Sequence, residues 1–139
     1  MGVVIAGVGW LVALSAYDIR RRRLPNWLTL PGAVAILCAA TWSGRGSAAL
    51  AGAAALAALY GIVHVISPRA MGGGDVKLAL GVGAMTGAFG LDVWVLAALG
   101  APILTSVVAL VALLRGNATV PHGPSMCLAS AAAVGLVLV

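Results

Sequence analysis

Charged residues are scarce in this chain, and acidic residues are the scarcest. Only 8% of the 139 residues are charged, whereas soluble domains carry about 25%. The three acidic residues are Asp18, Asp75 and Asp92, and glutamate is absent. Hydrophobic residues make up 63% of the chain, and the mean hydropathy is +1.14. This composition excludes an ordinary soluble domain and predicts an integral membrane protein.

Cysteine is also rare, and its placement excludes two kinds of site. Cys38 and Cys127 each lie inside an apolar run, and the sequence contains no CxxC pair. We therefore expect two buried thiols rather than a disulfide framework or a zinc site. Neither a metal nor another cofactor is expected. The net charge of +5 does not indicate nucleic acid, because the basic residues lie in short connections and form no basic face.

Apolar runs that could cross a membrane recur along the whole chain. A hydrocarbon core of about 30 Å needs about 20 apolar residues per helix. A membrane barrel would alternate polar and apolar residues, and this sequence does not. We predict an all-α, polytopic membrane protein, with one domain over residues 1–139 that forms a bundle of about six transmembrane helices. The expected spans, of which the second, fourth and sixth are short, are 2–17, 27–42, 47–66, 76–89, 93–114 and 125–139.

Basic residues are distributed unequally between the two faces of the predicted bundle. Seven of the eight fall on one face, and Arg45 alone falls on the other. Because an excess of Lys and Arg marks cytoplasmic connections, we expect an inner-membrane protein with both termini outside and three cytoplasmic connections. Asp18 and Asp75 then lie at the cytoplasmic face and Asp92 at the opposite face. Since the hydrocarbon core is about 30 Å thick, only Asp18 and Asp75 can meet.

The segment "AYDIRRRRLPNWL" places Asp18 at a span end, with four arginines after it. The arginines alone are explained as a topology anchor, with Asp18 as an ion-pair partner of Arg22. An ionisable residue this close to the lipid boundary is costly, however, and usually serves a function. Pro25 is placed to open the next helix. Pro25 and Asn26 are candidate substrate-binding residues.

The segment "MGGGDVKL" places Asp75 directly after Gly72, Gly73 and Gly74, with Lys77 two residues later. One interpretation is structural, in which the glycines form a turn and Asp75 caps the following helix. The functional interpretation is that glycines leave the backbone unobstructed, so that an extended peptide can approach the carboxylate. Lys77 could pair with a phospholipid or with an acid.

The segment "VPHGPSM" breaks the chain at the same predicted face. Its histidine, His122, is either part of a bare turn or a residue of the site. His64, near the expected cytoplasmic end of the third span, has the same two interpretations.

In this order, the three segments resemble the signature regions of the type IV prepilin peptidases, which are membrane aspartic peptidases of the GxGD type. The resemblance extends from Asp18 to Pro124. It implies that Asp18 and Asp75 match the catalytic aspartates and that Gly72 and Gly74 match the glycines of GxGD. Longer relatives carry paired CxxC motifs and also methylate the processed substrate, so methyl transfer is not expected here. In size, the chain is similar to the minimal peptidases of tight-adherence pilus systems.

The resemblance implies an aspartic endopeptidase that cleaves the basic leader from type IV prepilin-like membrane proteins at the cytoplasmic membrane face. The two aspartates would share a proton and activate water. The alternative is a non-enzymatic membrane subunit or small transporter in which both aspartates are structural caps. Almost wholly apolar span centres disfavour a transporter. The residues expected to contact the substrate are Gly72, Gly73, Gly74, Pro25, Asn26, Lys77 and His122.

Overall fold

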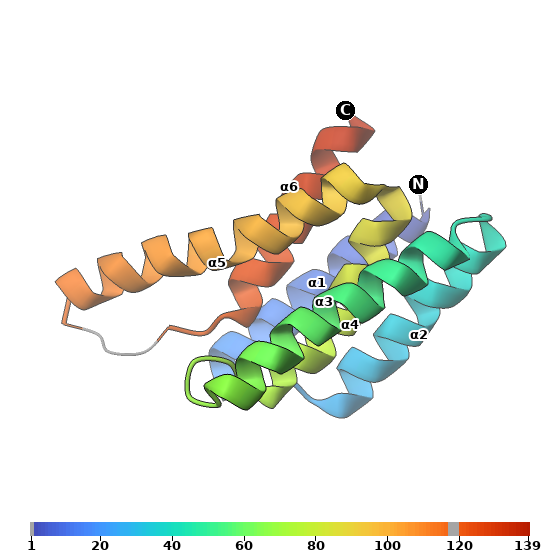
Figure 1. Cartoon of the computed structure of the whole chain (residues 1–139). Helices are drawn as coiled ribbons and strands as arrows, with labels where there is room; N and C mark the ends of the chain where they lie inside the picture. The colour runs from blue at the N-terminus through green and yellow to red at the C-terminus, as the bar shows by residue number, and fades with distance from the viewer. Residues whose placement is uncertain (1, 117–119) are drawn as a thin grey trace.

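Helices account for most of the chain in the computed structural model, which describes residues 2–116 and 120–139 and, of residues 2–4, only the backbone (Figure 1). The prediction of an all-α membrane bundle is confirmed for these residues. The helices are α1 (Gly2–Arg21), α2 (Asn26–Trp42), α3 (Gly46–Ile66), α4 (Gly73–Phe89), α5 (Leu91–Leu114) and α6 (Gly123–Leu138).

The helices differ in length, as the sequence predicts. Within the described residues, α3 and α5 are long and apolar enough to cross a membrane, whereas α2 and α6 are shorter apolar helices of 17 and 16 residues. α1 continues past the expected end of its span and includes Asp18, because its backbone hydrogen bonds continue into the polar segment. It stops before Arg22, whose φ of 49° is a left-handed conformation that ends a helix.

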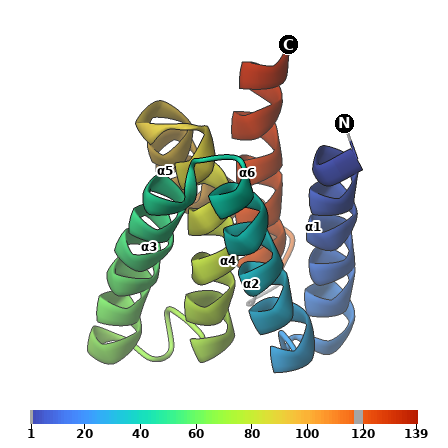
Figure 2. The same ribbon diagram turned by 90° about the vertical axis from the view of Figure 1, so that its right-hand side faces the viewer.

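α4 lies at the centre of the bundle and packs against α2, α3, α5 and α6 (Figure 2). Its interface with α3 is the most extensive one. Glycines allow this approach, because a β-carbon on Gly83 would collide with the backbone oxygen of Gly52 on α3. In lipid, such close backbone packing replaces the hydrophobic driving force between helices. α1 lies at the edge of the bundle, where it contacts α6 and α2.

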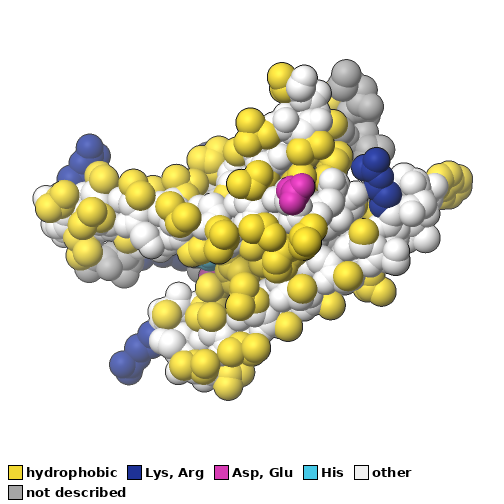
Figure 3. Space-filling model, turned by 45° about the horizontal axis from the view of Figure 1, so that its top comes forward, with side chains coloured by type: hydrophobic (Ala, Val, Ile, Leu, Met, Phe, Trp, Pro, Cys, Tyr) yellow, Lys and Arg dark blue, Asp and Glu magenta, His cyan; other side chains and the backbone are white. Residues whose placement is uncertain are grey.

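The second half of α5 projects away from the other helices (Figure 1). Its buried residues, Val93, Ala97, Ala98 and Ala101, all lie in its first half. The space-filling view shows a notch between this projecting end and the neighbouring end of the bundle (Figure 3). Because α4 begins and α1 ends at that end of the bundle, the notch lies on the side of the molecule that carries Asp18 and Asp75.

Large apolar side chains cover the outside of the bundle, as expected for surfaces that face lipid (Figure 3). Cys38 lies on this outer surface, so the expectation that its thiol is buried is wrong. Hydropathy marks α2 as apolar but does not say which of its sides faces the core. Cys127 is buried, as expected.

Candidate active site

Asp18 lies in the last turn of α1 and is buried, with only 7% of its surface exposed. Its Oδ2 accepts a hydrogen bond of 3.1 Å from the backbone N–H of Gly123, the first residue of α6. A helix N-terminus offers unpaired N–H groups and favours a negative charge. A β-carbon at position 123 would collide with Oδ2 of Asp18. The first and third sequence segments therefore meet at this contact, which requires a glycine.

Asp75 is the third residue of α4 and is half-buried. Its Oδ2 accepts a hydrogen bond of 3.3 Å from the N–H of Gly72, the residue that precedes the helix. Gly73 and Gly74 already belong to the first turn, so only Gly72 of the three lies outside the helix. Gly74 lies against Leu24, and a β-carbon here would be 3.3 Å from Cβ of Leu24. The second segment thus packs on the loop that follows Asp18.

Lys77 and Asn26 connect the starts of α4 and α2. The Lys77 Nζ donates a hydrogen bond of 2.8 Å to the Asn26 side-chain oxygen. Within the described residues, the hydrogen bond of the Lys77 side chain is thus to an amide, and its pairing with a phospholipid stays a prediction. Pro25 directly precedes α2, and its carbonyl accepts hydrogen bonds from the N–H groups of Leu28 and Thr29. These contacts fix the first segment against the second.

His122 joins three parts of the bundle. Its Nδ1 lies 2.6 Å from the Thr105 hydroxyl on α5, and its Nε2 lies 3.2 Å from the Tyr60 hydroxyl on α3. The Thr105 hydroxyl already donates its proton to the Ala101 carbonyl, so it must accept from Nδ1. This assigns the histidine proton to Nδ1 and leaves Nε2 to accept from Tyr60. Hydrogen bonds at both ring nitrogens therefore hold His122, the residue before Gly123, in place.

The surroundings of the two aspartates favour retention of a proton. Both lie at span ends rather than within the membrane-spanning segments. Burial raises the pKa of the Asp18 carboxyl above its ordinary value of 3.8, and the negative charge of Asp75 raises it further, whereas the Gly123 N–H and His122 lower it. Burial also raises the pKa of Asp75, against the opposing effect of the Gly72 N–H. Burial lowers the pKa of His122, although Asp18 opposes this shift.

The sequence model of the type IV leader peptidase family matches residues 5–139, which is nearly the whole chain. The chain belongs to the type IV leader peptidase family. No curated protein and no solved structure matches it. Membership confirms the resemblance inferred from the three ordered segments, and it supports peptidase activity on leader peptides in general.

Most of the residues predicted for the site lie at one end of the bundle, and Asp92 lies at the other. Asp18, Asp75, the Gly72–Gly74 segment and His122 come together at one end of the bundle, with Pro25, Asn26 and Lys77 beside them. Asp92 lies in the first turn of α5, after the far end of α4. A helix of 17 residues such as α4 is about 25 Å long, so Asp92 lies far from the pair. His64 contacts the Met71 carbonyl through its Nδ1, at 2.6 Å.

The sequence did not predict a role at the site for Tyr60, Thr105 or Gly123, which contact His122 or Asp18. Gly123 stands inside a quoted segment, and its position between two prolines was an available signal. Apart from His64, Tyr60 is the only residue of α3 that is neither small nor aliphatic, which was a weaker signal. Nothing in the sequence distinguishes Thr105 from the other hydroxyl residues of apolar helices. Among the described residues, no group of three or more His, Cys, Asp or Glu is placed to hold a metal ion.

Proposed function

We propose that this family member is an aspartic endopeptidase that removes the basic leader from type IV prepilin-like membrane proteins, with Asp18 and Asp75 as the catalytic pair. The observation that carries the proposal is the convergence of the two carboxyls. The charge of Asp75 acts on Asp18, and backbone N–H groups of Gly123 and Gly72 orient the two side chains. A purely structural role would not require two acids to lie close enough for the charge of Asp75 to oppose the ionisation of Asp18.

The chemistry follows from one proton shared between two carboxyls. The ionised carboxylate accepts a proton from a water molecule, whose oxygen attacks the scissile carbonyl carbon. The protonated carboxyl donates its proton to the carbonyl oxygen, which gives a neutral tetrahedral intermediate. When the C–N bond breaks, the carboxyl that received the water proton donates it to the leaving amine. The other carboxylate takes a proton from one hydroxyl of the intermediate, which leaves a carboxylic acid and restores the shared proton. The raised pKa of both carboxyls supports retention of the shared proton.

Substrate placement follows from the polarity of the bundle. The apolar segment of a prepilin-like substrate would lie in the bilayer, and we place it in the notch beside the projecting half of α5 (Figure 3). Its leader would extend past Gly72, where the absence of a side chain leaves room beside the Asp75 carboxylate. Because seven of the eight basic residues belong to this end of the molecule, we place the active site at the cytoplasmic face of the inner membrane.

The decisive experiment replaces each acid by its amide. Asn keeps an oxygen that accepts the backbone N–H of Gly123 or Gly72, but it cannot take up or return a proton. We expect Asp18→Asn and Asp75→Asn each to lower cleavage at least about 100-fold, since loss of acid–base catalysis alone costs about 100- to 10,000-fold. The measurement is co-expression with a prepilin-like protein, followed by immunoblotting for a leader-sized shift.

Asp92→Asn is the matched control, because it makes the same substitution at an exposed acid far from the pair. It should process the substrate at nearly the wild-type rate, and all variants should accumulate in the membrane. Near-normal processing by either Asp18→Asn or Asp75→Asn would mean that this aspartate is only a structural cap.

A further inference from the structure

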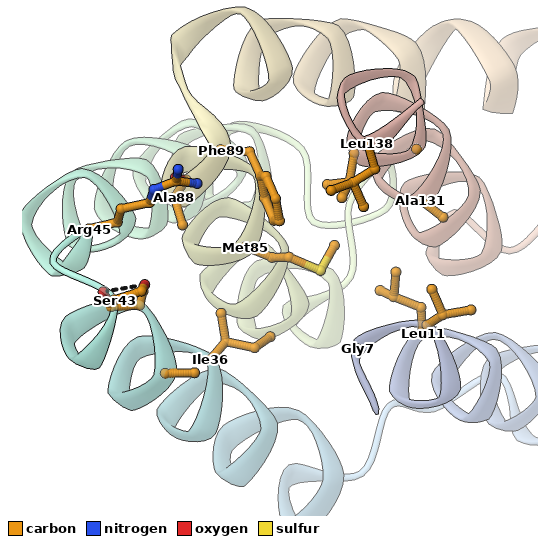
Figure 4. A pocket seen from close by; sticks show the side chains of 15 residues that line it. Gly7, Leu11, Ile36, Ser43, Arg45, Met85, Ala88, Phe89, Ala131 and Leu138 are labelled. Atoms are coloured by element: carbon orange, nitrogen blue, oxygen red, sulfur yellow. Dashed lines mark hydrogen bonds between the residues drawn. The ribbon is translucent and has the colours of Figure 1, made fainter. Parts of the chain in front are cut away.

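A pocket of about 320 Å³ lies at the end of the bundle opposite to Asp18 and Asp75 (Figure 4). Its walls come from the first half of α1 and from the final turns of α2, α4 and α6. Apart from Ser43 and Arg45, all of the lining residues are apolar or glycine. The pocket is therefore distinct from the candidate active site, and its surface is unsuited to a polar ligand.

Trp10 packs one helical turn from the pocket, on the side that faces the aspartates. Its indole Nε1 donates a hydrogen bond of 2.9 Å to the Leu28 carbonyl on α2. The ring also packs so tightly on Gly32 of α2 that a β-carbon there would collide with it, and it contacts Gly81 of α4 in the same way. Both glycines lie one helical turn before Ile36 and Met85, which are the first residues of α2 and α4 to line the pocket. The Trp10 ring therefore lies between the pocket and the part of the bundle that carries the aspartates.

The two ends of the pocket differ in polarity. Along α2 it extends from Ile36 to Ser43, a distance of about 10 Å at 1.5 Å per residue. Ile36 and Leu11 lie toward the middle of the bundle, whereas Ser43 and Arg45 lie at the surface end (Figure 4). Arg45 is exposed, and its Nη1 lies 3.5 Å from the Ala88 carbonyl at the end of α4. This contact holds the guanidinium across the mouth of the pocket.

We propose that this pocket binds one acyl chain of an anionic phospholipid from the leaflet opposite to the aspartate pair, with the Arg45 guanidinium contacting the phosphate. A lipid in that leaflet has its charged group at the membrane surface and its chain directed toward the midplane, which is the polarity of the pocket. One Ala88 contact leaves other N–H donors of Arg45 for phosphate oxygens. A substrate helix, whose diameter is about 10–12 Å, is too wide for a pocket of about 320 Å³.

Trp10 provides a direct reporter of the bound chain. In a variant that keeps Trp10 and replaces Trp27, Trp42 and Trp94 by Phe, the full chain is reconstituted in phosphatidylcholine vesicles. Phosphatidylglycerol or phosphatidylcholine with brominated acyl chains is then added as a quencher. We expect saturable quenching of Trp10, with apparent binding about fivefold tighter for phosphatidylglycerol, the order expected of one basic residue near anionic lipid.

Two pocket variants and one matched control test the site itself. Arg45→Gln should remove the preference for phosphatidylglycerol. Gly7→Leu should abolish saturable quenching, because a β-carbon on Gly7 would lie 3.8 Å from Sδ of Met85, an ordinary contact across the pocket. Ala58→Leu adds the same side chain on the exposed side of α3 and should change neither result.

Native mass spectrometry of the otherwise unaltered chain gives a second measurement that needs no tryptophan replacement. One phosphatidylglycerol should stay bound, and Gly7→Leu should lose it. Equal, non-saturable quenching by both lipids, unchanged in Gly7→Leu, would overturn the proposal. So would normal lipid retention in Gly7→Leu combined with slower cleavage of a prepilin-like substrate, which would assign the pocket to the substrate helix instead.

Discussion

Gly123 is needed at the active site because it has no side chain. Its N–H contacts Asp18, and a β-carbon would occupy the position of the carboxylate oxygen. We expect Gly123→Ala to lower cleavage about 10- to 100-fold, which corresponds to the loss of a hydrogen bond to a charged group. Initial rates on a prepilin-like substrate would measure the effect.

Gly135→Ala is the control for this substitution, because it lies on the same helix and a β-carbon there meets no atom within 4 Å. It should retain full activity. Equal rates for the two variants would show that the Asp18 carboxylate can move without loss of function.

Titration of Asp18 and Asp75 should also set the pH dependence of cleavage. Burial raises the pKa of both, and the charge of Asp75 further raises that of Asp18, so a proton stays on the pair at pH values above the ordinary 3.8. Cleavage should fall at low pH, where both carboxyls are protonated, and at high pH, where the shared proton is lost. The maximum should lie above pH 3.8.

Initial rates of the purified protein across pH would test this, with helical circular dichroism recorded at each pH to exclude unfolding. A rate that rises steadily with pH and never declines would indicate a single deprotonated group and would contradict the shared-proton mechanism.

At the scale of the elements, His122 couples α3 and α5 to the start of α6. Tyr60→Phe removes the hydroxyl that donates to Nε2 but keeps the ring, whose centroid lies 5.6 Å from that of His122. Since a neutral hydrogen bond contributes about 1 kcal/mol, we expect roughly fivefold slower cleavage as Gly123 becomes less well positioned. Tyr17→Phe, which retains the edge-to-face contact with Trp27, is the matched control. Equal rates for both variants would remove His122 from any positioning role.

The helices were predictable from the sequence, whereas their rotation about their own axes was not. Hydropathy located each described helix to within a few residues, because lipid requires long apolar helices whose backbone groups are paired internally. The grouping of Asp18 with Asp75 followed from counting spans and basic residues. Tyr60 and Thr105 could not be placed, since α3 and α5 are apolar on all sides and no polar face indicates which residues point inward. For the same reason, the exposure of Cys38 and the packing of Trp10 on Gly32 and Gly81 escaped prediction.

At the scale of the whole molecule, the two ends of the bundle have different chemistry. The end with the aspartate pair also carries the arginine-rich loop after α1, whereas the other end carries Arg45 and the apolar pocket. Helices that alternate in direction place Arg21 at the end of α1, and Arg69 and Arg115 after α3 and α5, at the aspartate end. The orientation of the bundle in the membrane therefore decides which compartment the catalytic pair faces.

Labelling of single cysteines in intact cells would determine this orientation. The background lacks the native Cys38 and Cys127, and cysteines are introduced one at a time at exposed arginines. We expect Arg21→Cys to be shielded from an impermeant thiol reagent, together with Arg69→Cys and Arg115→Cys, because basic connections stay in the cytoplasm.

Arg45→Cys should be labelled in the same cells, because Arg45 is exposed at the opposite end of the bundle. Permeabilised cells provide the control, since all introduced cysteines should then react. Labelling of Arg21→Cys in intact cells with protection of Arg45→Cys would place both aspartates outside. A peptidase in that orientation could not meet a substrate leader that stays in the cytoplasm. Such a result would remove the proposed site of cleavage while leaving the family assignment unchanged.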